Sequence, residues 1–122
     1  MSEHENQKLV EAAFLNRELL KDPIYKDAVL ATVEDLDKGR LRVATQVSQG
    51  EWITHAWVKR AVLMYFGVSS MQKLDCAPFE FYDKVPLKKD LDKAQVRVVP
   101  PGTVRYGSFL EPGCIVMPGY VN

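Results

Sequence analysis

The sequence has 122 residues, and 16 Lys and Arg balance 16 Asp and Glu, so the formal net charge is zero. Hydrophobic residues make up 47% and charged residues 26%, which are ordinary values for a globular domain and exclude a disordered chain. The longest apolar run, residues 61–66, is far shorter than the roughly 20 residues of a membrane span. A net charge of zero gives no indication that the protein binds nucleic acid or an anionic membrane.

The N-terminus is polar and acidic, with no apolar stretch behind a basic start, so we expect no secretory signal. Two cysteines, Cys76 and Cys114, are far apart, and neither has another Cys or His at the spacing of metal ligands. His4 and His55 do not cluster with them. We therefore expect two reduced cysteines and no metal site.

The first two helices are separated by a proline. The pattern predicts a helix over residues 5–21, which Asp22-Pro23 ends because Pro disfavours a helical residue before it. A second helix begins at Pro23 and ends at Gly39, a typical left-handed cap. Its apolar residues form one continuous stripe: Tyr25, Val29, Val33 and Leu36.

The pattern then changes to alternation. Residues 41–47 are expected to form a half-buried strand, and a turn at 48–50 leads to a second strand at Trp52-Ile53, so a hairpin is predicted. Thr54 can cap a third helix that runs to about Phe66, and this helix is apolar on most faces, as a largely buried helix would be.

Further short strands follow the third helix. They are expected at Met71–Cys76 and Phe79–Tyr82, and a charged connection over residues 84–93 leads to an extended segment, Gln95–Val99. Residues 1–100 thus read as an α+β domain of three helices and short strands.

The last nineteen residues repeat with a period of six. Aliphatic residues stand at 104, 110 and 116, glycines at 107, 113 and 119, and further hydrophobic residues at 109, 115 and 121. This period fits neither a helix nor an alternating strand, and it is typical of a hexapeptide β-helix in which the aliphatic residue points inward and Gly forms the corner. The alternative is a Gly/Pro-rich loop with accidental spacing.

Three hexads make one triangular coil, and one coil cannot bury its own interior. The sequence therefore predicts that residues 101–122 begin a β-helix that continues in a longer protein.

Several polar residues are candidates for function on residue type alone. Arg97 could bind a carboxylate or be a strand residue that faces solvent or pairs with Asp. Arg105, on the first hexad, is expected to be a solvated charge, and His55 to be a structural histidine. Asp83 and Lys84 could brace a loop, although an exposed pair contributes only ~0–1 kcal/mol. We expect four aromatic residues to form core: Trp52, Trp57, Tyr65 and Phe66.

Five stretches, in order along nearly the whole chain, resemble the N-terminal part of one family, the tetrahydrodipicolinate N-succinyltransferases. They are LRVA at 41–44, WITHAWVKRAVL at 52–63, FYDKVPLK at 81–88, RVVPP at 97–101 and VMPGYVN at 116–122. The RVVPP stretch that leads into hexapeptide repeats is the more specific part of the resemblance.

The resemblance implies a fold and an activity. The family has a helical N-terminal domain followed by a left-handed β-helix, and its members are cytoplasmic homotrimers of bacterial lysine and diaminopimelate synthesis. They transfer succinyl from succinyl-CoA, a co-substrate, to the nitrogen of a cyclic dicarboxylate, and they hold no permanent cofactor. The Arg of RVVPP contacts the dicarboxylate, so the resemblance assigns substrate binding to Arg97.

The resemblance also implies that the catalytic and CoA-binding residues lie beyond Asn122, so that this chain alone would be inactive. Two alternatives stay open. The chain could be a non-catalytic oligomerisation or interaction module that caps a β-helix, or a self-contained α+β protein with a Gly-rich tail.

Overall fold

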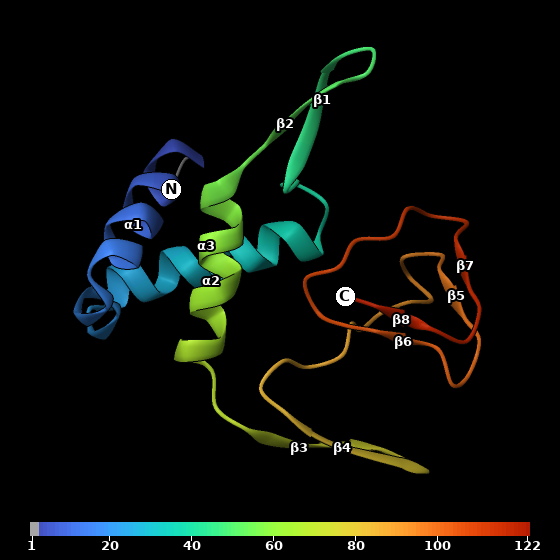
Figure 1. Cartoon of the computed structure of the whole chain (residues 1–122). Coiled ribbons are helices and arrows are strands. Elements are labelled where there is room, and N and C mark those ends of the chain that lie inside the picture. The colour runs from blue at the N-terminus through green and yellow to red at the C-terminus, as the bar shows by residue number, and fades with distance from the viewer. Residues whose placement is uncertain (1–2) are drawn as a thin grey trace.

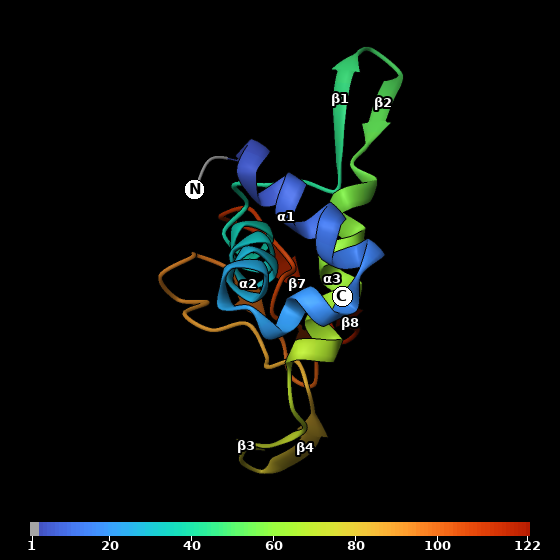
Figure 2. The same cartoon turned by 90° about the vertical axis from the view of Figure 1, so that its left-hand side faces the viewer.

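The computed structural model describes residues 3–122. Three helices pack together on one side of the molecule, and a coil of short strands lies on the other side (Figure 1). Two β-hairpins project from the body at opposite ends, as the rotated view also shows (Figure 2). The prediction of three helices and short strands is confirmed.

The first predicted helix is shorter than expected. Helix α1, Glu3–Leu15, ends before Asn16, and a separate 3-10 helix, η1, covers Arg17–Lys21. The Asn16 side chain accepts a hydrogen bond from the Glu18 amide at 3.2 Å, and such local bonding competes with a continuous helix. The expectation of one helix over 5–21 is therefore wrong at its C-terminal end.

Helix α2, Pro23–Asp37, matches the predicted boundaries closely. The Asp22 carboxylate caps it by accepting a hydrogen bond from the Ile24 amide at 3.0 Å, which satisfies one of the free amides of the first turn. Gly39 has a φ of +72°, in the left-handed region that was expected for this cap.

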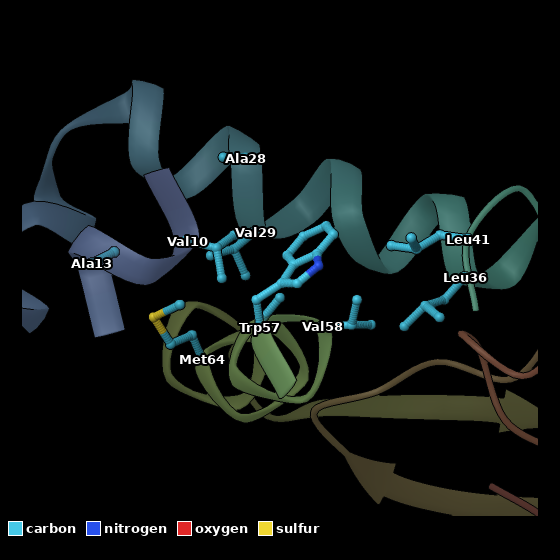
Figure 3. Packing of buried hydrophobic residues seen from close by; sticks show 10 residues of the cluster. Val10, Ala13, Ala28, Val29, Leu36, Leu41, Trp57, Val58 and Met64 are labelled. Carbon is cyan, nitrogen blue, oxygen red and sulfur yellow. The ribbon is translucent and has the colours of Figure 1, made fainter. Parts of the chain in front are cut away.

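The core lies between the three helices (Figure 3). Helix α3, Ala56–Val68, buries Trp57, Val58, Ala61 and Met64 against α1 and α2. Leu63 of the same helix is 49% exposed, so α3 is buried on one broad face rather than on most faces. Trp57 belongs to the core as predicted.

The first hairpin differs from its expected burial. It consists of β1, Ala44–Ser48, and β2, Glu51–Thr54, paired antiparallel. Trp52 is 62% exposed on it, so its expected place in the core is wrong: the hairpin leaves the body, and no other element covers it (Figure 1). Thr54 ends β2, and His55 is the residue before α3, without a side-chain capping bond.

The second hairpin consists of β3, Gln72–Cys76, and β4, Phe79–Asp83, paired antiparallel over their whole length. The chain then returns to the body, where Val85 is buried. The connection after it pairs with the start of the coil, since the Lys88 amide donates to the Val104 carbonyl at 2.9 Å and the Tyr106 amide donates to the Pro86 carbonyl at 3.0 Å.

The coil contains four two-residue strands: β5, Arg97–Val98; β6, Thr103–Val104; β7, Ile115–Val116; and β8, Tyr120–Val121. β5 pairs with β7 and β6 with β8, both parallel, and the paired residues are 17 or 18 positions apart. That separation equals about three of the predicted hexads. Gly107 and Gly113 have φ values of +96° and +91°, as expected for corner glycines, and the first aliphatic anchor, Val104, is buried.

Among residues 3–122, no helix combines the length and the hydropathy that a membrane crossing requires.

Candidate functional site

Arg97 lies on the outside of the coil. Its neighbour Val96 is buried, whereas Arg97 is exposed. Its backbone is held in the parallel ladder, because the Arg97 amide donates to the Cys114 carbonyl at 3.0 Å and the Val99 amide donates to the Val116 carbonyl at 2.8 Å. No carboxylate of the described residues forms an ion pair with its guanidinium. Arg97 is therefore a cation with a fixed backbone and an uncommitted side chain.

Arg105 is not the solvated charge that was expected. Its side chain is only 17% exposed, and Nη2 donates to Asp83 Oδ2 at 2.8 Å. Nη1 donates to Asn122 Oδ1 at 3.3 Å, and the guanidinium carbon lies 5.3 Å from the centre of the Phe66 ring. The expectation failed because the connection that follows β4 pairs with the coil through Leu87 and Arg105, which brings Asp83, the last residue of β4, beside the arginine.

This pair changes the expected role of Asp83. The hydrogen bond from Arg105 and the backbone amide of Lys84 hold the pKa of the Asp83 carboxyl below its usual value, since both favour the charged form. Lys84 does not pair with its sequence neighbour, because its ammonium donates to the Phe66 carbonyl at 3.0 Å. The two residues therefore join the coil and α3 to the end of the second hairpin.

A buried polar junction that was not predicted from the sequence connects α2 to the coil. Asp37 and Lys88 have side chains only 4% and 6% exposed, and Lys88 Nζ lies 2.9 Å from Asp37 Oδ1. The same carboxylate oxygen accepts a hydrogen bond from the Gly107 amide at 2.9 Å. One signal was available: Asp37 follows Val33 by four residues, so it extends the buried stripe of α2.

Tyr106 adds to this junction. Its hydroxyl donates to the Glu34 carboxylate. Burial raises the pKa of Tyr106 well above its usual value, and the hydrogen bond with Glu34 raises it further, because both disfavour the phenolate. The hydroxyl therefore remains a donor to α2 throughout the physiological pH range.

A pocket of about 540 Å³ lies between α2, α3 and the coil. We call it the interdomain pocket. Its walls are mostly apolar, and His55 lines it, with Nε2 2.9 Å from Thr45 Oγ1. That hydrogen bond agrees with the structural role expected of His55. Arg97 does not line this pocket.

Neither cysteine forms a disulfide, and Cys76 and Cys114 are both half-buried. Within residues 3–122, no three side chains of His, Cys, Asp or Glu form a group that could hold a metal ion.

Comparison with known proteins gives one consistent result. Residues 5–68 match a family model described as "Tetrahydrodipicolinate N-succinyltransferase N-terminal". A 2,3,4,5-tetrahydropyridine-2,6-dicarboxylate N-succinyltransferase of Tolumonas auensis is 42% identical over 126 aligned residues, which cover 95% of this chain and 46% of that protein. Proteins of the same name from Aeromonas salmonicida and Albidiferax ferrireducens are 42% and 43% identical, with the same coverage. The chain spans about half the length of these curated relatives.

Proposed function

This chain belongs to the tetrahydrodipicolinate N-succinyltransferase N-terminal family, and on that premise we propose that it forms the N-terminal part of a CoA-dependent N-succinyltransferase. Water adds to the C=N bond of tetrahydrodipicolinate and opens the ring to an amine and a ketone. The amine nitrogen then takes the succinyl group from the thioester of succinyl-CoA, and its proton leaves with CoA as the thiol. The observation that carries the proposal is the identity of about 42% over 95% of the chain. It extends beyond the matched residues 5–68 to the coil.

The proposed architecture has two parts. Residues 1–100 form the α+β domain, and residues 101–122 start a left-handed parallel β-helix. Parallel pairing between residues 17 or 18 positions apart supports this. In a triangular coil of three hexads, residues separated by one full coil lie one above the other on the same face. By the same relationship we propose a cytoplasmic homotrimer in lysine and diaminopimelate synthesis, with succinyl-CoA as co-substrate and no resident cofactor.

In the proposed reaction, Arg97 binds one carboxylate of the dicarboxylate substrate. A guanidinium can donate two parallel hydrogen bonds to a carboxylate, which fixes both the position and the orientation of that group. The exposed position of Arg97 and its lack of a carboxylate partner among the described residues support this role. Its backbone bond to Cys114 would keep the Cα of Arg97 at a constant place on the coil.

The test measures CoA release from succinyl-CoA in the presence of tetrahydrodipicolinate, with the complete protein to which this sequence belongs. Arg97→Ala should lower kcat/KM for the dicarboxylate by roughly ten- to a hundredfold, because each charge-assisted bond contributes about 1.5–3 kcal/mol. Arg97→Lys keeps the charge but loses the planar fork, so it should lie between Ala and the parent. The KM for succinyl-CoA should stay nearly constant.

Arg17→Ala is the matched control, since Arg17 lies in η1 and contacts Phe14 rather than the coil. It should leave both kinetic constants unchanged. If Arg97→Ala keeps the parent kcat/KM for the dicarboxylate, Arg97 does not bind the substrate. If the parent protein assembles but shows no transfer at all, the interaction module described above replaces the enzyme as the function.

A further inference from the structure

We propose that the interdomain pocket binds a small organic anion with an apolar body, such as an aliphatic monocarboxylate. Its volume of about 540 Å³ lies within the range of small-molecule sites, roughly 300–1,000 Å³. Apolar walls come from both parts of the chain: Val33 and Leu36 of α2, Val62 of α3, and Phe109 of the coil. Such walls favour a ligand with an apolar body.

The charged side chains that line the pocket all have the same sign. Arg42, Lys59 and Arg105 line it together with His55, and no Asp or Glu does. The whole chain carries 16 basic and 16 acidic residues, so this excess belongs to the pocket and not to the composition. Charges of one sign beside apolar walls of low dielectric attract the opposite charge more strongly than they would in open water.

Arg105 contributes no free donor to the pocket. It uses Nη2 for Asp83 and Nη1 for Asn122, and its Nε, which has no hydrogen-bond partner, is too deeply buried for a ligand in the pocket to reach. Arg42 is the arginine of the wall that can bind an acceptor. Arg42 lies over the Phe109 ring, with its guanidinium carbon 4.4 Å from the ring centre. Arg42 forms no ion pair with any of the described residues.

These observations select the ligand class. A cation is disfavoured because no Asp or Glu side chain lines the pocket. A small inorganic anion would leave the apolar walls uncovered, and a neutral apolar molecule would leave Arg42 without an acceptor. A carboxylate attached to an apolar chain pairs with the positive charge and also covers the apolar walls. Arg97 does not line the pocket, so this proposal and the proposed succinyl transfer can fail separately.

The experiment titrates the ¹⁵N-labelled 122-residue chain with octanoate and follows amide shifts by NMR; its C-terminus is amidated, so that Asn122 adds no carboxylate to the pocket wall. Octylamine has the same chain with the opposite charge, and acetate has the charge without the chain. We expect octanoate to bind at least about tenfold more tightly than either, a difference of about 1.4 kcal/mol. The shifts should centre on His55, Phe66 and Gly107. Equal binding of octanoate and octylamine, or shifts centred elsewhere, would overturn the proposal.

Variants that remove positive charge test which side chains bind the carboxylate. Arg42→Gln combined with Lys59→Gln removes two exposed positive charges that line the pocket, and it should weaken octanoate binding by roughly three- to tenfold. Lys89→Gln is the matched control, because Lys89 is exposed but does not line the pocket. It should leave the affinity unchanged. An equal loss in both variants would show a general charge effect and would contradict the proposal.

Discussion

Replacing Asp37 by alanine removes the acceptor at the centre of the junction between α2 and the coil. In the folded protein the Asp37 carboxylate accepts hydrogen bonds from the Lys88 ammonium and the Gly107 amide, both at 2.9 Å. After the substitution, Lys88 keeps only its bond to the backbone carbonyl of residue 37, at 2.7 Å. Its ammonium, in a side chain only 6% exposed, would then lack a counter-charge.

The magnitude follows from this burial. Removing one partner of a buried ion pair typically costs about 3–5 kcal/mol, because the other charge remains desolvated. A domain of this size has a free energy of unfolding of about 5–15 kcal/mol, so Asp37→Ala should remove a large part of it. The expected fall in Tm is roughly 10–20 °C.

The comparison variant is Glu80→Gln, which breaks the Lys73–Glu80 pair of the second hairpin. That pair has a similar length, 2.8 Å, but both side chains are more than two-thirds exposed, so its loss should cost less than about 1 kcal/mol. Urea unfolding followed by circular dichroism measures both. If Asp37→Ala costs no more than Glu80→Gln, the junction is hydrated in solution and the reasoning is wrong. Adding Lys88→Met to Asp37→Ala should recover stability, because the unpaired charge is removed.

Three further predictions concern other parts of the chain. Gly39→Ala should destabilise the folded protein by about 1–3 kcal/mol. A Cβ at this position would lie 2.7 Å from ring atoms of Phe109, and the backbone has a φ of +72°. Thermal unfolding measures the effect, and an unchanged Tm would contradict the prediction. Because Arg105 lowers the Asp83 pKa below its ordinary value of 3.8, the stabilisation by Asp83 is present above about pH 4 and lost as pH falls through the lowered pKa. The free energy of unfolding, measured with urea, should therefore fall less between pH 6 and pH 3 in Asp83→Asn than in the parent protein. The difference should be less than about 1 kcal/mol, because the pair is partly exposed. Amides of residues 104–121 should exchange with deuterium faster than the core amides of α3, since the coil strands have only two residues each; equal protection would refute this.

Local rules in the sequence were sufficient for much of the fold. The boundaries of α2 follow from Asp22, Pro23 and Gly39, whose capping and backbone preferences act within one turn. Of the three glycines that the six-residue period places at corners, Gly107 and Gly113 have positive φ and Gly119 does not. Glycine adopts positive φ without a steric cost, so the period indicated where such a conformation could occur. The sequence resemblance that named the family also needed no coordinates, and the comparisons confirm it.

Other predictions failed where burial depends on distant parts of the chain. Trp52 has the large hydrophobic side chain of a typical core residue, yet it is exposed because nothing packs on its hairpin. Arg105 was expected in solvent, yet Asp83 and Phe66 enclose it. In both cases, hydrophobicity or charge indicates what a side chain prefers, whereas the packing of elements decides whether a partner is available.

The polar junction shows this limit most clearly. Asp37 and Lys88 are 51 residues apart, and no periodicity relates them. The position of Asp37 on the apolar stripe of α2 indicated that a charge would be buried, but it did not identify the partner. Only the return of the chain after the second hairpin brings Lys88 and the Gly107 amide to the same carboxylate oxygen. The sequence by itself determined the boundaries of α2, the positive φ of Gly107 and Gly113, and the family, because these follow from local sequence patterns. The tertiary structure decided which charges are paired and where the interdomain pocket opens, because these depend on contacts between segments that are remote in the chain.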